Sequence, residues 1–241
     1  MTVSTLSNYD HLATYFTKLP EFSIQGTTEY LVAREVPKLI RKISPLSKIL
    51  DLGCGTGIAT RFLKQQFPQA SVIGADINSA MLEQASIADP SGIYLQLDKN
   101  NSPFLPNTFD AIICSYVLHE NQQLNELQTF LASIAKLLRP EGLFVAWDTN
   151  KDLFQGKWVT IEGVSPKEKE IVDGEKYKVK LLPAAAEVDG TYWSPEIVTK
   201  FAKVTGFNEC KTHYPLAEND DLEWLDETKL APYFIFEAVK S

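Results

Sequence analysis

The 241-residue chain is 44% hydrophobic and 22% charged, values typical of a globular protein with one α/β domain, some elaborations and a sizeable core. Its formal net charge of −8, without a run of Lys or Arg, argues against a nucleic-acid partner. The apolar runs are too short for a membrane partner and no signal-peptide pattern is present, so we expect a cytoplasmic protein.

The chain begins with an aromatic-dotted segment, residues 1–45, for which we expect helices, the clearest over residues 27–43. Strands are predicted at 47–51, 71–76, 93–97, 109–115 and 143–147. Helices are predicted between them from residue 58 to 67, from 78 or 79 to before 90, and from 124 to 138. This alternation predicts right-handed β-α-β crossovers and a mainly parallel sheet with helices on both faces.

Residues 149–192 are too long a segment for a bare connection and should have structure of their own. Strands are predicted at 158–161 and 177–182, with a turn at Asp173-Gly174, so we expect a small β-containing lid. A helix over 196–205 and strands over 209–214 and 233–239 follow. The predicted organisation is an N-terminal helical lid segment (1–45), a core (46–148), a lid insertion (149–192) and the C-terminal part of the core sheet (193–241).

A glycine-rich turn, Asp51-Leu52-Gly53-Cys54-Gly55-Thr56-Gly57, follows the first predicted strand. Glycines there allow a positive φ and let a ligand approach the backbone closely. The turn does not fit the dinucleotide pattern G-x-G-x-x-G, because the third position falls on Ile58 or Thr60. It also lacks the Gly-Lys-Ser/Thr ending of a phosphate-binding P-loop.

Two acidic residues limit which ligand the glycine turn can bind. The carboxylate of Asp51 would repel a pyrophosphate in the loop and would favour an ammonium group. Asp76 ends the second strand, where an acid can accept hydrogen bonds from both ribose hydroxyls. A ligand with a ribose and an ammonium but no phosphate is S-adenosylmethionine, which we therefore expect as the cofactor.

Several segments together resemble the motifs of class I, Rossmann-like S-adenosylmethionine-dependent methyltransferases. The resemblance covers about residues 45–148 and is carried by residues 51–57, 74–78, 81–82, 98–110, 117–119 and 138–142. Ser102 stands where Leu is usual, and Glu141 replaces a more frequent Gly. The resemblance implies a seven-stranded sheet with an antiparallel last strand, and makes residues 46–148 the cofactor-binding core.

The resemblance also implies which residues contact the cofactor. Asp51, Gly53 and Gly55 would surround the methionine end, with Asp76 on the ribose and Asp98 on the adenine amine. The full implied set is Asp51, Gly53, Cys54, Gly55, Gly57, Asp76, Ile77, Met81, Asp98, Lys99, Ser115 and Tyr116. Ile77 and Met81 are equally typical of a hydrophobic core, and Asp98 of a solvated strand end.

Methyl transfer to oxygen or nitrogen also requires the acceptor to lose a proton, so a general base can assist. His119, just beyond the fourth strand, is the candidate catalytic residue, although it also suits a packing role. Glu120 and Asp148 are alternatives that also suit solvated acids. The cysteines Cys54, Cys114 and Cys210 lack metal-ligand spacing, so reduced thiols and no metal are expected.

Acceptor-binding candidates are the aromatic residues of the two lid segments and the core edge, which also suit simple packing. They are Tyr9, Tyr15, Phe16, His119, Trp147, Trp158 and Tyr192. Lys176, Lys178 and Lys180 alternate along one strand and suit a solvated outer face better than an acidic substrate.

The sequence therefore predicts methyl transfer to an oxygen or nitrogen of a small-molecule, secondary or specialised metabolite. Nucleic-acid amino-methyltransferases carry an Asn/Asp-Pro-Pro-aromatic motif where this chain has Cys114-Ser115-Tyr116-Val117, which argues against that activity. A carbon methyltransferase of quinone or sterol type remains an alternative. From other classes, a non-catalytic cofactor-binding module or a nicotinamide-dependent enzyme remain open, as does the oligomeric state.

Overall fold

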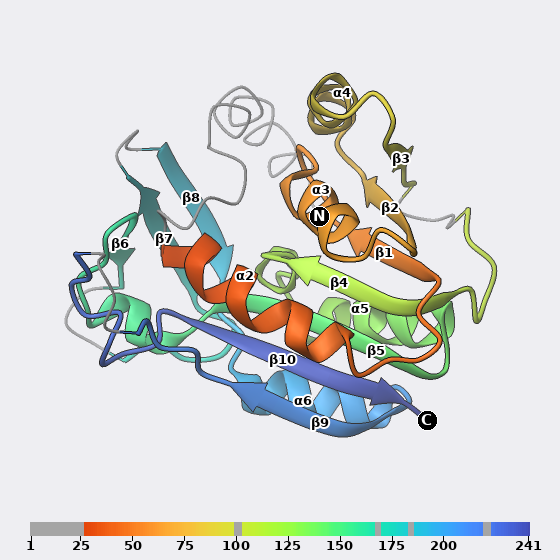
Figure 1. Ribbon diagram of the computed structural model, residues 1–241. Coiled ribbons are helices and arrows are strands. Elements are labelled where there is room, and N and C mark those ends of the chain that lie inside the picture. Colours follow the sequence, from red (N-terminus) through yellow and green to blue (C-terminus); the bar gives the residue numbers. More distant parts are fainter. Residues whose placement is uncertain (1–26, 99–102, 167–169, 183–185, 219–222) are drawn as a thin grey trace.

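The computed structural model describes residues 27–98, 103–166, 170–182, 186–218 and 223–241 (Figure 1). Its main feature is a seven-stranded sheet of order β3-β2-β1-β4-β5-β10-β9. The strands from β3 to β5 in this order run parallel, and β10 is antiparallel to both of its neighbours. Their bounds are β1 Lys48–Leu52, β2 Ser71–Asp76, β3 Ile93–Gln96, β4 Phe109–Ser115, β5 Leu138–Thr149, β9 Phe207–His213 and β10 Tyr233–Lys240. The predicted fold class is confirmed.

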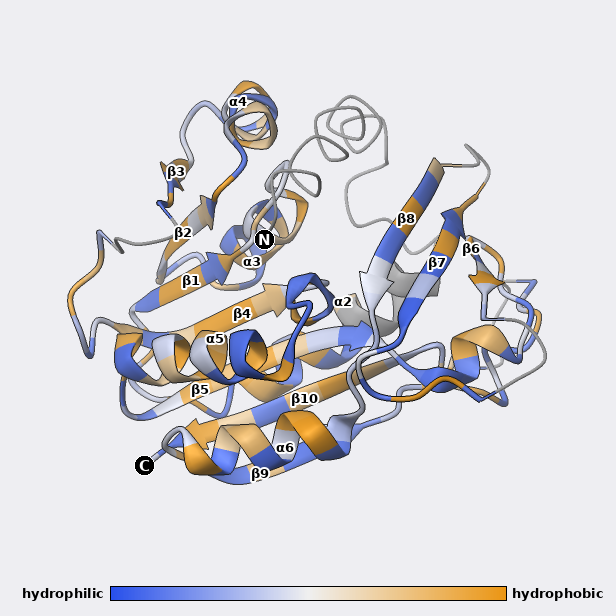
Figure 2. Cartoon of the chain, turned by 180° about the vertical axis from the view of Figure 1, so that it is seen from behind, coloured by the Kyte–Doolittle hydropathy of each residue, from blue (hydrophilic) through white to orange (hydrophobic). Residues whose placement is uncertain are grey.

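Helices cover both faces of this sheet, as Figures 1 and 2 show from opposite sides. α2 and α3 pack on the face that receives Ile49 and Ile113, whereas α5 and α6 pack on the face that receives Leu50 and Ile112. The helices are α2 Thr27–Ile40, α3 Ile58–Gln66, α4 Ser79–Ala88, α5 Leu124–Leu137 and α6 Pro195–Val204, with short 3-10 helices η1 Leu118–Glu120 and η2 Lys151–Phe154. Because central strands are buried on both faces, their sequences are continuous apolar runs. None of the helices in the described parts of the chain is long and apolar enough to cross a membrane.

The connection between α5 and β5 differs from the prediction. The helix ends at Leu137, and β5 begins at once with Leu138, opposite Phe109. Regular pairing with β4 is interrupted and resumes at Leu143, opposite Ala111, which is where the sequence predicted the strand to start. Glu141 lies within the interruption with a φ of 62°, so the chain bulges out of the sheet there.

A second, three-stranded antiparallel sheet follows β5 and is called the β6–β8 sheet. Its strands are β6 Ile161–Ser165, β7 Lys176–Leu181 and β8 Ala186–Thr191. Figure 1 shows it beyond the carboxyl end of β4. The predicted β-containing insertion is thus present.

The predictions inside this small sheet were partly wrong. The strand expected at 158–161 begins only at Ile161, because Trp158 is fixed before it by a hydrogen bond from its Nε1 to the carbonyl of Leu153. Its apolar side chain indicates burial in a small core and not a strand. β8 was not predicted, since residues 186–191 include two acids and a glycine, which local propensity disfavours in strands. Pairing with β7 overrides that propensity.

Candidate active site

The glycine turn connects β1 to α3 at the carboxyl ends of the parallel strands. The backbone N–H groups of Gly53 and Cys54 both donate to the carbonyl of Ala75 on β2, at 2.7 and 3.1 Å. Gly57 forms the N-cap of α3, and its N–H donates to the Cys54 carbonyl at 2.9 Å. The loop is therefore held against the end of β2, beside Asp76.

Two glycines in the loop are required for different reasons. Gly53 has a φ of 77°, and a Cβ there would lie 2.4 Å from Cγ2 of Val117, so close packing excludes a side chain. Gly55 has a φ of 53°, but none of the described atoms lies within 4 Å of where its Cβ would be. Gly55 is thus where a ligand can approach the backbone of the loop.

Asp51, the last but one residue of β1, is fully buried. Its Oδ2 accepts a hydrogen bond from the Thr60 hydroxyl on α3 at 2.5 Å, whereas its Oδ1 has no partner among the described residues. Burial raises the pKa of Asp51 to about 7, and the charge of Asp76 adds to this effect, although the Thr60 hydroxyl opposes it. A buried acceptor without a donor is costly, so this oxygen fits a cationic ligand group such as an ammonium.

Asp76 ends β2 with both carboxylate oxygens already oriented. Its Oδ2 accepts from the N–H of Gly55 at 2.8 Å, and its Oδ1 from the N–H of Asn78 at 2.9 Å. Burial raises the pKa of Asp76, while these backbone hydrogen bonds oppose the rise. Each oxygen keeps further lone-pair capacity, so the carboxylate can still accept hydrogen bonds from a pair of hydroxyls.

The residues expected around the adenine lie beyond Asp76. Asn78 caps α4 by accepting from the N–H of Met81 at 2.9 Å. Met81 is buried, Ile77 is half-buried and Asp98 is exposed. These positions are compatible with the expected contacts and equally with a core role, so the adenine assignments stay predictions. Lys99 lies outside the described residues.

The end of β4 carries the residues expected near the sulfonium. Ser115 and Tyr116 are half-buried, and Tyr116 has a φ of 54°, unusual for a residue with a side chain. The N–H of Tyr116 donates to the Trp147 carbonyl at 3.1 Å. Its ring packs edge-on against Tyr233 on β10 at a centroid distance of 5.4 Å, and lies 6.5 Å from the His119 ring.

His119 is buried in η1 between two carboxylates. Its Nδ1 lies 3.1 Å from Oδ1 of Asp148, and its Nε2 lies 3.2 Å from Oε1 of Glu120. Burial alone would lower its pKa, but the charge and hydrogen bond of Asp148 and the contact with Glu120 raise it to about 10. Glu120 and Asp148 are only 8% and 4% exposed, so the idea that they are solvated acids was wrong. His119 as a general base stays a prediction, and a pKa near 10 means that it holds a proton at neutral pH.

The aromatic residues expected to bind the acceptor lie in two different hydrophobic clusters. Trp158 and Tyr192 belong to the hydrophobic cluster beneath the β6–β8 sheet, whereas Trp147 is buried against α2 and α3. Packing explains their burial, and contact with an acceptor stays a prediction. Tyr9, Tyr15 and Phe16 lie outside the described residues.

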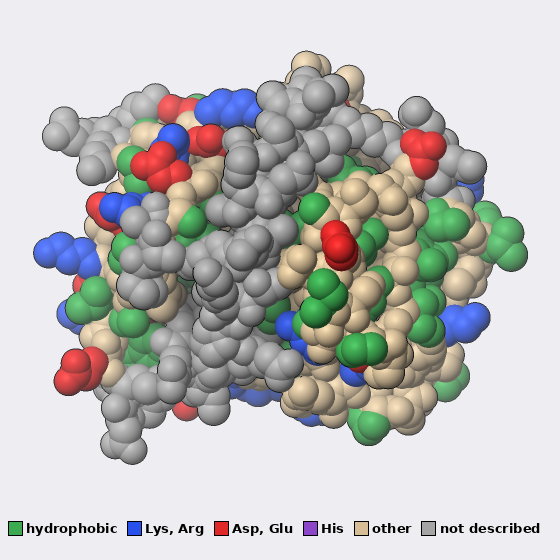
Figure 3. Space-filling model, turned by 90° about the horizontal axis from the view of Figure 1, so that it is seen from above, with side chains coloured by type: hydrophobic (Ala, Val, Ile, Leu, Met, Phe, Trp, Pro, Cys, Tyr) green, Lys and Arg blue, Asp and Glu red, His purple; other side chains and the backbone are tan. Residues whose placement is uncertain are grey.

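Two lysines of β7 have partners within the β6–β8 sheet. Lys178 pairs with Glu187 at 2.7 Å and with Asp189 at 3.8 Å, and Lys176 donates to the Thr191 hydroxyl at 2.7 Å. Figure 3 shows acidic and basic side chains intermixed over this part of the molecule. This arrangement is typical of a solvated outer face.

Sequence reasoning missed Thr60 and Thr149, and it considered Tyr177 only as one of the aromatic residues of the lid. Thr60, which holds Asp51, could have been noticed as a polar residue on the otherwise apolar buried face of α3. Tyr177 on β7 and Thr149 on β5 share a hydrogen bond of 3.0 Å between their hydroxyls. The Tyr177 ring also lies 6.1 Å from that of His119. The sequence carries no local signal for the hydrogen bond between Thr149 and Tyr177, because these two residues are 28 positions apart.

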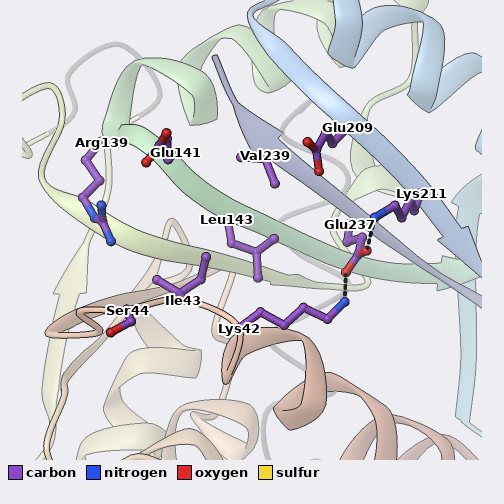
Figure 4. A pocket seen from close by; sticks show the side chains of 10 residues that line it. All are labelled: Lys42, Ile43, Ser44, Arg139, Glu141, Leu143, Glu209, Lys211, Glu237 and Val239. Carbon is purple, nitrogen blue, oxygen red and sulfur yellow. Dashed lines mark hydrogen bonds and ion pairs between the residues drawn. The ribbon is translucent and has the colours of Figure 1, made fainter.

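A pocket of about 320 Å³ lies elsewhere, at the amino ends of the parallel strands (Figure 4). In it, the buried carboxylate of Glu237 is bridged by Lys42 at 3.3 Å and by Lys211 at 3.9 Å. Its charged lining is balanced, with Glu141, Glu209 and Glu237 against Lys42, Arg139 and Lys211. The glycine loop and its acids are at the opposite edge of the sheet, so this pocket is separate from the candidate site.

Comparisons with known proteins agree with this geometry. Residues 49–142 match the family described as methyltransferase domain. The chain is 36% identical over 109 residues to an uncharacterized methyltransferase of Synechocystis, covering 45% of this chain and 50% of that protein. It is 35% identical over 104 residues to the ubiquinone/menaquinone biosynthesis C-methyltransferase UbiE of Desulfotalea psychrophila, covering 42% and 41%. The chain thus spans about half the length of the curated relatives it matches.

Among solved structures, the CcbJ methyltransferase of Streptomyces caelestis has a similar fold. Its TM-score is 0.67 at 15% identity, and the match covers 97% of this chain and 98% of that one. The likeness therefore extends beyond residues 49–142 to nearly the whole fold. Residues 49–142, which carry the glycine loop and its two acids, are thus similar to a methyltransferase domain, and the fold as a whole is similar to that of a solved methyltransferase.

Proposed function

We propose that this protein binds S-adenosylmethionine and transfers its methyl group to an oxygen or nitrogen of a small-molecule acceptor. The observation that carries the proposal is Oδ1 of Asp51, a fully buried acceptor without a donor among the described residues, beside the open approach to Gly55. An ammonium would supply the missing hydrogen bond, and at Gly55 none of the described atoms blocks a ligand's approach to the loop backbone. A metabolite of secondary or specialised type remains the expected acceptor.

The residues present fit this cofactor. Asp51 would hold the ammonium, Asp76 would accept the ribose hydroxyls, and the backbone of residues 53–57 would lie along the ligand. When bound, S-adenosylmethionine supplies an electrophilic methyl group. The protein then has to align the acceptor and exclude water, and the β6–β8 sheet, fixed by Tyr177 beside His119, is positioned to cover the end of β4.

Carbon methylation is the second candidate. The similarity to a quinone-biosynthesis C-methyltransferase favours it, although that match covers only 41% of the relative. A carbon acceptor presents no N–H or O–H group at the reacting atom. The groups around the end of β4 therefore decide between the two candidates.

The test is calorimetric titration with S-adenosylmethionine, S-adenosylhomocysteine and NAD. We expect both sulfur ligands to bind and Asp51→Asn to weaken them by about 10–100-fold, since a buried charged hydrogen bond contributes roughly 1.5–3 kcal/mol. Asp189→Asn removes the same charge from an exposed site on β8 and should leave binding unchanged.

Binding of NAD without binding of S-adenosylmethionine would overturn the proposal, as would full affinity in Asp51→Asn. If the cofactor binds, a panel of small molecules screened for release of S-adenosylhomocysteine identifies the acceptor. A protein that binds the cofactor and turns over no acceptor class would be a cofactor-binding module.

A further inference from the structure

Glu120, His119 and Asp148 form one buried chain of charges at the carboxyl ends of β4 and β5. Asp148 uses both oxygens on His119, accepting from its backbone N–H at 3.1 Å through Oδ2 and contacting its Nδ1 at 3.1 Å through Oδ1. Oδ1 also accepts from the N–H of Thr149 at 2.8 Å, so the carboxylate has a fixed orientation. The imidazole then contacts Glu120 at 3.2 Å.

The two neighbouring carboxylates determine whether the His119 ring can accept a proton. With a carboxylate near each ring nitrogen, the ring is stabilised as an imidazolium that donates to Asp148 through Nδ1 and forms an ion pair with Glu120 through Nε2. A protonated ring has no lone pair to accept a proton from an acceptor molecule. Its effect is to hold the Glu120 carboxylate in one position.

Glu120 lies in η1, which packs against β5 and against β8 of the small sheet. Val117, the N-cap of η1, lies against Gly53 of the glycine loop, so η1 adjoins the loop as well. Burial raises the pKa of Asp76, and the charge of Glu120 adds to it. Burial and the charge of Asp148 raise the pKa of Tyr177, and Glu120 adds to that shift too. Glu120 is therefore within electrostatic reach of the ribose-binding acid and of the covering sheet.

Resting on the proposed function, we propose that Glu120 is the specificity-determining residue at the point of methyl transfer, and that His119 and Asp148 are positioning residues that hold it there. Its carboxylate accepts a hydrogen bond from an acceptor that presents an N–H or O–H at the reacting atom. Amines and hydroxyl compounds are the acceptor class that this group recognises. Acceptors with a carboxylate or phosphate at that point are repelled.

Sinefungin tests this assignment without knowledge of the acceptor. It is an S-adenosylmethionine analogue in which a carbon bearing an ammonium group replaces the methyl-bearing sulfonium, so its ammonium projects where the methyl would be. We expect the protein to bind sinefungin more tightly than S-adenosylhomocysteine. Glu120→Gln should weaken sinefungin about tenfold and change S-adenosylhomocysteine affinity less than twofold. Glu187→Gln, which removes an exposed carboxylate on β8, should change neither.

The positioning role has its own readout. ¹⁵N NMR of the imidazole, assigned by the signals lost in His119→Gln, should show both ring nitrogens of His119 protonated at pH 8. Glu120→Gln should lower the pKa of His119 by at least one unit, and Glu187→Gln should not. In His119→Gln the preference for sinefungin should fall, because Glu120 is no longer held.

The outcomes separate the inference from the proposed function. A preference for sinefungin that survives Glu120→Gln, or a neutral His119 ring at pH 8, overturns the inference while cofactor binding stands. If neither sinefungin nor S-adenosylhomocysteine binds the wild-type protein, the proposed function fails and the inference falls with it. Circular dichroism and thermal unfolding of each variant establish that it is folded before titration.

Discussion

Asp51 places an ionisable group where water cannot reach it. Its carboxyl is fully buried, and its pKa is raised to about 7 from an ordinary value near 4, chiefly by that burial. Near neutral pH the free protein therefore holds a mixture of protonated and ionised Asp51. Only the ionised form can pair with an ammonium.

This mixture makes cofactor binding depend on pH. We expect the affinity for S-adenosylhomocysteine to rise by about tenfold between pH 6 and pH 8, since the fraction of ionised Asp51 rises by about that factor. Calorimetry in buffers of different ionisation enthalpy should show proton release on binding at pH 6. Asp51→Asn should bind weakly and equally at both values. A pH-independent affinity in the wild-type protein would contradict the role given to Asp51.

Substitutions at the two loop glycines should have different effects, one mainly on stability and the other mainly on ligand binding. Gly53→Ala forces a Cβ against Val117 at a positive φ, so we expect a loss of about 2–4 kcal/mol in the free energy of unfolding. Gly55→Ala meets open space and carries only backbone strain, a loss of about 1 kcal/mol, but the added methyl occupies the ligand's approach. Denaturant unfolding and calorimetry on both variants check this. Equal losses of stability in the two variants would refute the distinction.

At the scale of elements, the Tyr177 side chain connects the β6–β8 sheet to the main sheet through a hydrogen bond. Tyr177 reaches from β7 to Thr149 on β5, and its ring contacts those of His119 and Phe154 at centroid distances of 6.1 and 5.5 Å. Gly190 on β8 lies opposite, and a Cβ there would come within 2.4 Å of the Tyr177 ring. The Tyr177 ring therefore packs directly on the backbone of β8, where only a glycine fits at position 190.

Removing the Tyr177 hydroxyl should loosen this sheet without disturbing the core. Tyr177→Phe deletes the hydrogen bond to Thr149, worth about 1 kcal/mol, and leaves a buried hydroxyl unpaired. Amide hydrogen exchange should accelerate in β6, β7 and β8 and stay unchanged in β1 and β4. Tyr214→Phe, at an exposed position, serves as the control. Uniform acceleration across the whole chain would show that the sheet is not a separate unit.

At the scale of the whole molecule, the fold gathers its acids at one edge. Asp51, Asp76 and Asp148 come from β1, β2 and β5, and η1 with His119 and Glu120 follows β4. The carboxyl ends of parallel strands meet at the same edge of a sheet, so these side chains converge although the sequence separates them widely. His119 lies in η1 and is the cationic group of this cluster. It contacts Asp148 on β5 and its neighbour Glu120.

This buried charge chain should make global stability fall at alkaline pH. His119 has a folded pKa near 10 against an ordinary value near 6.5, so its stabilising contribution is complete below pH 6.5 and is lost as pH rises through 10. Between pH 7 and pH 10 we expect the free energy of unfolding to fall by about 3 kcal/mol from this group. Denaturant unfolding across that range should show the slope in His213→Gln and not in His119→Gln. An equal slope in both variants would contradict the charge chain.

The local sequence pattern was sufficient to predict the strands and helices that are buried in the core. Ile112 and Ile113 lie in a continuous apolar run because both faces of β4 are covered, and that run predicted the strand. It was insufficient for β8, whose acids pair with Lys178 on β7, and for Trp158, whose apolar side chain was taken for a strand. For β8 the deciding contact is pairing with the neighbouring strand, and for Trp158 it is burial in a cluster that includes Ala217 and Tyr233, and neither shows in the local pattern.

The sequence by itself determined the alternating strands and helices of the core from β1 to β5 and the expected cofactor, because buried apolar runs, the loop Asp51 to Gly57 and the acid Asp76 are short-range patterns whose chemistry is local. Only the tertiary structure decided the state of His119. Its charge depends on Asp148, which is 29 residues away and reaches it only because β4 and β5 are neighbours in the sheet. That contact, together with Glu120, raises the pKa of His119 from an ordinary value near 6.5 to about 10. The group left to meet the acceptor is then Glu120.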